Sequence, residues 1–194
     1  MADLNFSYYG TIEEAATYFA MRLHEIAWSS ASVADRPKAL WAATQIIDTL
    51  NYKGFKAPVW TLLQQYGRID YPHSNVFVVP NGTVGQLRPT PDEIRVAEAS
   101  QDLEFPRGAD TDVPKEIRMA CYEIAHSLLD GKDPELELEN LGITSQGYGA
   151  VRTSYERNQV PIEHLINGVP NASAWRYLRP FLRDSDAIKI SRVN

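Results

Sequence analysis

The sequence predicts a mainly α-helical protein, built as a small helical bundle with short protruding β-elements and an extended C-terminal arm. In four segments of the first 130 residues, apolar residues recur at helical spacing. Two of these segments open with a capping box, the pairing that satisfies the free N–H groups of a first helical turn. Each apolar stripe is about three residues in seven wide, which is typical of helices that bury one face against each other.

The first two expected helices occupy the N-terminal fifty residues. One runs from Thr11 to Trp28 and opens with a capping box of Thr11 and Glu14. Its apolar face comprises Ile12, Ala15, Ala16, Phe19, Leu23 and Ile26. The other runs from Pro37 to Leu50, with proline suited to a first turn, and its stripe comprises Leu40, Ala43, Ile47 and Leu50.

Two further helices are expected after residue 89. One begins with the capping box of Thr90 and Glu93 and continues to Leu103. The clearest runs from Pro114 to Leu129 and stops at Gly131. Its stripe comprises Ile117, Ala120, Cys121, Ile124 and Leu128. Cys121 lies on that apolar face, so we expect a core residue rather than a reactive thiol.

Two regions have β-favouring composition. Residues 58–89 read as an insertion, with a short helix at 60–66 and a β-hairpin at 76–84 around Asn81-Gly82. Residues 143–155 are extended and contain Gly147-Tyr148-Gly149, which favours a tight turn. We therefore predict a core in residues 1–150, and a β-segment, a short helix and a docking arm in 151–194.

The C-terminal region differs from the rest of the chain in charge. Residues 151–194 hold seven Lys or Arg against four Asp or Glu, whereas residues 1–150 hold twelve against twenty-one. A short helix is expected from Ala172 to Leu182, started at Asn171 and ended by Pro180. The basic and aromatic side chains from here on are the candidate interface residues Trp175, Arg176, Tyr177, Arg179, Phe181, Arg183, Ile188, Lys189, Ile190 and Arg192.

Three kinds of surface suit a region of this composition: a nucleic acid strand, another protein chain, or the chain's own bundle. Aromatic residues alternating with arginine stack bases and neutralise phosphates in single-strand binders. Trp, Tyr and Arg also dominate protein interfaces, and a basic arm is attracted to the acidic body of a neighbouring copy. The third possibility is intramolecular, with Trp175, Leu178 and Leu182 packed on the chain's own bundle. For an intermolecular role, we expect deletion of residues 172–194 to leave a folded helical monomer.

No pattern in the sequence indicates catalysis, a metal or a cofactor. The four histidines are widely separated, and we expect hydrogen-bonded structural roles for His24 and His126. Asp133, Glu135, Glu137 and Glu139 alternate with other residues in what reads as a solvated acidic connector. The chain has no apolar run long enough to span a bilayer, and its first residues lack the pattern of a signal peptide. We expect a non-enzymatic protein made in a reducing cytoplasm.

Three stretches of the chain resemble a family of tailed-phage proteins. They are YYGTIEEAATYFAMRLHEIAWSSASVADRPKALWAATQIIDTLNYKGFKA, LEFPRGADTDVPKEIRMACYEIAHSLLDG and AWRYLRPFLRDSDAIKISRVN. The similarity covers roughly residues 8–57 and 91–194, and residues 58–89 depart from the pattern. Phe105 stands where many members have a tryptophan before the Pro-Arg pair. Members are described as head–tail connectors or adaptors, and many are labelled DnaT-like single-stranded-DNA-binding proteins.

The resemblance implies a structural adaptor of the virion, at the head–tail junction. Its copies would form a ring, of twelve subunits in the family, beneath the portal protein. The ring would extend the DNA channel and present a surface to a tail or nozzle protein, with DNA passing through without specific binding. An acidic body suits such a channel. The alternative implied by the family label is a single-stranded-DNA-binding protein of a DnaT-like replication type.

Overall fold

The computed structural model describes residues 6–23, 25–65, 89–141, 145–148, 151–154 and 163–183. The chain divides into two compact units, one comprising residues 1–52 and 115–194 and the other residues 53–114. The C-terminal helix at Ala172–Leu178 lies in the first unit, and the second unit contains the predicted insertion at residues 58–89. Within the described ranges, no helix has both the length and the apolarity needed to cross a lipid bilayer.

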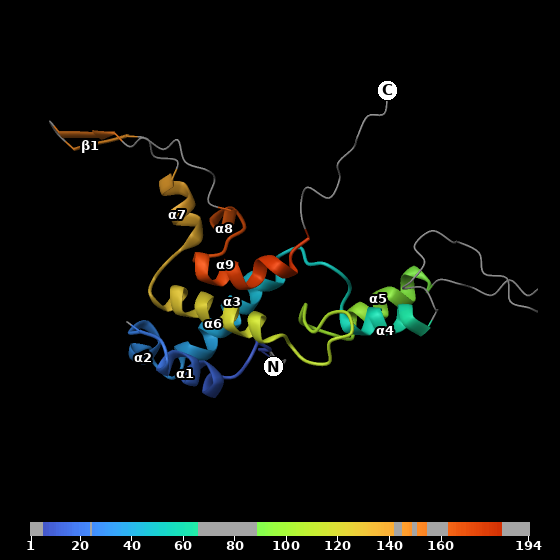
Figure 1. Cartoon of the computed structure of the whole chain (residues 1–194). Helices are drawn as coiled ribbons and strands as arrows, with labels where there is room; N and C mark the ends of the chain where they lie inside the picture. Colours follow the sequence, from blue (N-terminus) through green and yellow to red (C-terminus); the bar gives the residue numbers. More distant parts are fainter. Residues whose placement is uncertain are drawn as a thin grey trace, which may run out of the picture. The chain divides into compact units, whose positions relative to one another are not determined.

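The fold is mainly helical, as predicted (Figure 1). The helices of the first unit are α1 (Ile12–Ala20), α2 (Ala27–Ser30), α3 (Asp35–Asp48), α6 (Lys115–Leu129), α7 (Pro134–Leu141), α8 (Glu163–Ile166) and α9 (Ala172–Leu178). A 3₁₀ turn, Arg179–Phe181, follows α9 directly. The second unit contains α4 (Ala57–Gln65) and α5 (Pro91–Ala99).

Helix α6 is the centre of the first unit. It packs against α1, α2, α3 and α9, and Figure 1 shows α9, in red, running alongside α6, in yellow. Because neighbours surround it, α6 buries more than a single stripe, namely Ile117, Ala120, Cys121, Tyr122, Glu123, Ile124, Ala125 and Ser127. The predicted stripe of α3 is confirmed at Leu40, Ala43 and Ile47.

The N-terminal helix is shorter than predicted. The cap at Thr11 is confirmed, because its hydroxyl accepts the Glu14 N–H at 3.1 Å, whereas the Glu14 carboxylate accepts from the side chains of Arg118 and Tyr122. The helix ends at Ala20, where the Arg22 N–H bonds the Phe19 carbonyl in a tighter turn, and α2 starts separately at Ala27. Leu23 and Ile26 were predicted to be buried but are 84% and 71% exposed. Their apolar spacing fitted a continuous helix that the structure does not form.

The region between α6 and α9 contains one correction and one confirmation. Residues 134–141, predicted as a connector, form helix α7, and the Asp133 carboxylate accepts the Glu135 N–H at 3.0 Å before its first turn. The acidic side chains remain at the surface. The predicted extended region forms an antiparallel pair, β1 (Ser145–Tyr148) with β2 (Val151–Ser154). The predicted hairpin at residues 76–84 lies outside the described residues.

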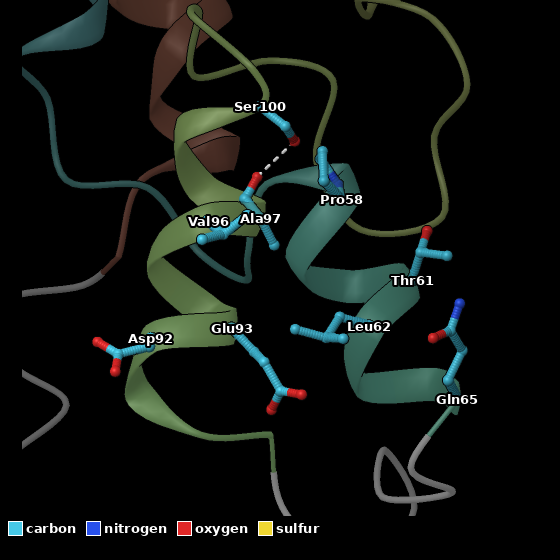
Figure 2. A pocket seen from close by; sticks show the side chains of 9 residues that line it. All are labelled: Pro58, Thr61, Leu62, Gln65, Asp92, Glu93, Val96, Ala97 and Ser100. Atoms are coloured by element: carbon cyan, nitrogen blue, oxygen red, sulfur yellow. Dashed lines mark hydrogen bonds between the residues drawn. The ribbon is translucent and has the colours of Figure 1, made fainter.

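The second unit is held together around Glu104. Its carboxylate forms ion pairs with Lys56, at 3.3 Å, and with Arg107, whose guanidinium also donates to the carbonyls of Lys53 and Gly54. The predicted capping box of α5 is confirmed in both directions between Thr90 and Glu93. A groove of about 650 Å³ runs between α4 and α5 (Figure 2).

Gly10, two residues before α1, lies close to the Tyr122 side chain of α6. The residue has φ +81°, and an added Cβ would lie 2.0 Å from the Tyr122 hydroxyl. We predict that Gly10→Ala lowers the free energy of unfolding by about 1–3 kcal/mol more than Gly131→Ala does, because overpacking adds to backbone strain. Gly131, with φ +78° and no atom near the added Cβ, is the matched control for strain alone. Equal losses in urea denaturation would show that Tyr122 is not held in this position.

Candidate functional site

The C-terminal helix α9 is fixed to the chain's own core by the residue that starts it. The Asn171 side chain accepts the Ala174 N–H at 2.6 Å and so caps the helix, as predicted. Its amide nitrogen donates to the Glu123 carbonyl at 2.8 Å and to the Ser127 hydroxyl at 2.6 Å. One side chain therefore both starts α9 and binds it to α6.

The inner face of α9 confirms the intramolecular possibility for two of its residues. Trp175 is 8% exposed and Leu178 is fully buried, and the Trp175 indole N–H donates to the Glu163 carboxylate at 3.3 Å. Trp175 is therefore committed to the core and lies outside the surface open to a partner. Leu182 is half-buried and forms a β-bridge with Tyr52.

The outer face of α9 and its 3₁₀ turn carries the remaining described candidates. Arg176, Arg179 and Arg183 are exposed, whereas Tyr177 and Phe181 are half-buried. None of the three guanidinium groups forms an ion pair or hydrogen bond with any residue that the structure describes. The Arg183 backbone N–H bonds the Asn51 carbonyl at 2.9 Å, so the chain is anchored up to that point. The other four candidates, Ile188, Lys189, Ile190 and Arg192, lie outside the described residues.

This arrangement changes the expected effect of truncation. The prediction that deleting residues 172–194 leaves a folded monomer is contradicted by the burial of Ala174, Trp175 and Leu178 against α6. Removing them would expose the apolar surface of α6 on which they pack. A deletion that spares the core must begin after Arg183.

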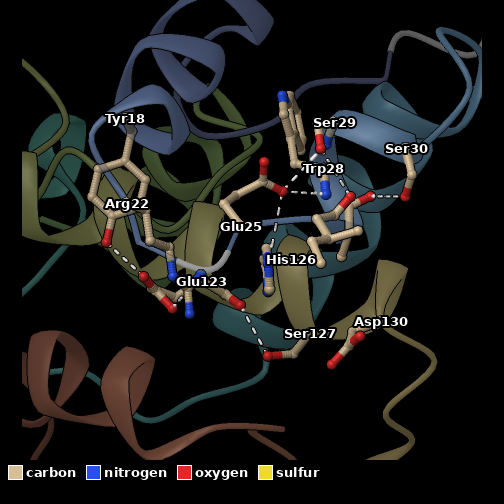
Figure 3. A network of polar contacts seen from close by, with 12 residues as sticks. Tyr18, Arg22, Glu25, Trp28, Ser29, Ser30, Glu123, His126, Ser127 and Asp130 are labelled. Atoms are coloured by element: carbon tan, nitrogen blue, oxygen red, sulfur yellow. Dashed lines mark hydrogen bonds and ion pairs between the residues drawn. The ribbon is translucent and has the colours of Figure 1, made fainter.

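A buried polar network, which sequence reasoning missed, joins α1 to α6 (Figure 3). Glu123 is 4% exposed; it accepts the Tyr18 hydroxyl at 2.6 Å and lies 3.1 Å from the Arg22 guanidinium. Burial and the contact with Glu123 raise the pKa of Tyr18, so the phenol keeps its proton and remains a donor. The sequence held one signal for this network: Glu123 lies next to the apolar stripe of α6, at a position that α1 covers.

Among the histidines that the structure describes, His126 packs against an aromatic ring of α1. His126 packs its ring 5.5 Å from that of Phe19, and its Nε2 lies 3.8 Å from the Glu25 carboxylate, too far for a hydrogen bond. Glu25 instead accepts the N–H groups of Trp28 and Ser29 at 2.6 and 3.2 Å, at the start of α2. His24 and His73 lie outside the described residues. His126 thus has a packing role, without the expected hydrogen bond.

The remaining chemical candidates are also structural. Cys121 is fully buried beside Thr44, and burial raises the pKa of its thiol to about 12, which disfavours the reactive thiolate. Among the residues that the structure describes, no group of three or more His, Cys, Asp or Glu side chains could hold a metal ion. The surface of α9, rather than a pocket of reactive groups, is the candidate functional site.

Asn171→Ala tests the attachment of α9. The variant loses the cap and leaves the Ser127 hydroxyl and the Glu123 carbonyl with one partner fewer, so we predict a loss of about 2 kcal/mol in the free energy of unfolding. Asn167→Ala is the matched control, because Asn167 is exposed and donates only to the Glu163 carbonyl. It should change stability by less than about 0.5 kcal/mol. Equal midpoints in urea denaturation would contradict the anchoring role.

His126 should make stability depend on pH. Burial, followed by the charge of Arg22, lowers the pKa of His126 below 6.5; Glu123, Glu25 and Asp130 act in the opposite direction. Below pH 6.5 the unfolded chain therefore binds more protons than the folded chain. The stabilisation that His126 contributes is complete above pH 6.5 and is lost as the pH falls toward the pKa of His126 in the folded state. The free energy of unfolding should decrease between pH 7.5 and 5.5, and less so in His126→Gln. Parallel pH profiles for the two proteins would refute this.

The comparisons with known proteins add no assignment. No family model, curated protein or solved structure matches the chain. The described geometry therefore carries the functional argument, together with the resemblance seen in three stretches of sequence. That geometry is an α9 held on α6 with three arginine side chains directed away from the core.

Proposed function

We propose that the protein is a structural head–tail adaptor of a tailed phage. In this role its copies form a ring, of twelve subunits, beneath the portal protein. The ring links the capsid to a tail or nozzle protein and extends the channel through which DNA passes without specific binding. The protein then resides at the head–tail junction of the virion, and its work is scaffolding rather than catalysis.

The observation that carries this proposal is the row of exposed arginines on α9 and the turn after it. Arg176, Arg179 and Arg183 have no acidic partner within the described residues, although the chain is acidic overall. Because the docking of α9 already fixes their backbone, these arginines lose only side-chain freedom when they bind, and their planar guanidinium groups suit carboxylates on another subunit.

Two further features support the adaptor over the DNA-binding alternative. The resemblance of residues 8–57 and 91–194 to connector proteins covers both α6 and α9. In addition, the net charge of −6 disfavours attraction of a nucleic acid strand to the whole molecule. The alternative also needs stacked aromatic rings, and the Trp175 ring is buried in the core.

Charge reversal at the three arginines tests the proposal. We predict that Arg176→Glu, Arg179→Glu and Arg183→Glu together leave circular dichroism and the urea midpoint nearly unchanged, because these side chains are exposed. The same variant should lose co-sedimentation with the cognate portal by at least tenfold, since like charges then meet at the interface. Lys38→Glu, Lys115→Glu and Lys132→Glu together give the matched control. It carries the same change in charge at exposed sites of α3, of α6 and of the turn after α6.

Unchanged portal binding by the α9 variant, or equal loss in the control, would refute the role of this surface. The DNA-binding alternative is tested with the same proteins. Titration with a single-stranded oligonucleotide at low salt should leave the intrinsic fluorescence of the wild type unchanged. A salt-sensitive change that disappears in Tyr177→Ala would support the alternative, because base stacking on an aromatic ring contributes about 1–3 kcal/mol.

A further inference from the structure

The groove between α4 and α5 has an apolar floor and acidic residues at one end. Residues one helical turn apart on each helix line it: Pro58, Thr61, Leu62 and Gln65 from α4, and Asp92, Glu93, Val96, Ala97 and Ser100 from α5. Figure 2 shows the Leu62 side chain directed toward α5, with Glu93 projecting between the helices at the end where α5 begins. Val96 is 71% exposed although it lies over this apolar floor. An open apolar surface bordered by charge is typical of a docking site for a peptide segment.

The chain itself contains a segment with the matching chemistry. Residues 188–192 read Ile-Lys-Ile-Ser-Arg, so two isoleucines alternate with polar residues and two basic groups are present. In an extended strand, Ile188 and Ile190 would face the same side, as insertion into an apolar floor requires. Lys189 and Arg192 are complementary in charge to Asp92 and Glu93. The Asp92–Arg95 pair, at 2.7 Å, is exposed and of the weak surface type, whereas the Glu93 carboxylate accepts the Thr90 N–H at 2.7 Å.

The dimensions of the two parts agree. Helices α4 and α5 have nine residues each, which corresponds to a groove about 14 Å long at 1.5 Å per residue. Five extended residues, 188–192, span about 16 Å. Extended to the same degree, residues 184–187 would add about 13 Å between this segment and Arg183, the last residue anchored on the first unit. That length would allow the segment to reach a second copy.

We propose that residues 188–192 of one copy bind in the α4–α5 groove of a second copy. This inference rests on the proposed ring function. The segment and the groove are different surfaces of the chain. A contact between different surfaces is head-to-tail, and repetition of such a contact closes into a ring or continues as a filament. Each copy supplies one segment and one groove, so every copy in a closed ring is held to both neighbours.

Disulfide trapping between two single-substitution variants of the full chain tests the proposal. Val96→Cys and a size-tagged Ile190→Cys are mixed under mild oxidation, and we predict a mixed dimer that forms at least tenfold faster than with Val33→Cys in place of Val96→Cys. Val33 is the matched control, since it is 80% exposed and belongs to the other unit. The native Cys121 is fully buried and does not compete. Adding Lys189→Glu and Arg192→Glu to the tagged variant should slow the trapping at least fivefold.

Three results would overturn the proposal. Equal rates with Val33→Cys would mean that the segment has no preference for the groove. Absence of a mixed dimer would mean that the segment does not bind the groove of a second copy. A disulfide that forms only within a single chain, in the double variant Val96→Cys/Ile190→Cys, would place the segment on its own groove. Co-sedimentation of the wild type with portal is measured in parallel, so that trapping without portal binding refutes the adaptor function alone.

Discussion

Burial of the Glu123 carboxylate in the middle of α6 is the constraint on which the first unit depends. A carboxylate removed from water costs several kcal/mol unless hydrogen bonds and an opposite charge replace its hydration. Tyr18 and Arg22 provide these groups from α1 and from the turn after it. The backbone carbonyl of the same residue accepts the Asn171 side chain, which starts α9. One position on α6 therefore fixes α1 on one side and α9 on the other.

The docked α9 separates the C-terminal region into two parts with different roles. Its inner side chains, Trp175 and Leu178, complete the core, while its arginines project outward from a rigid support. The sequence beyond Arg183 contributes an apolar and basic segment that matches the α4–α5 groove in chemistry and length. In the proposed ring, the fixed arginines and this segment would act as two separate contacts, one toward the portal and one between copies.

Local sequence signals predicted those elements whose start or end is fixed by nearby residues. The capping box of Thr90 and Glu93, the cap at Asn171 and the stop at Gly131 are local hydrogen-bond or glycine effects, and all three are observed. The break after Ala20 was missed because Leu23 and Ile26 continue the apolar spacing of α1. It depends in part on a long-range contact, since Arg22 meets Glu123, whereas Glu25 starts α2 through a local bond to the Trp28 N–H. The burial of Trp175 likewise depends on a long-range contact, and composition alone does not show which surface covers its ring.

The central claim is that copies of this chain assemble on a portal through a surface supported by α9. Electron microscopy of the purified protein mixed with its cognate portal tests it most directly. The account predicts class averages with a second ring of density stacked on the tail-proximal end of the portal, with one adaptor copy per portal subunit. Portal rings without added density, together with free monomers of the adaptor, would contradict it.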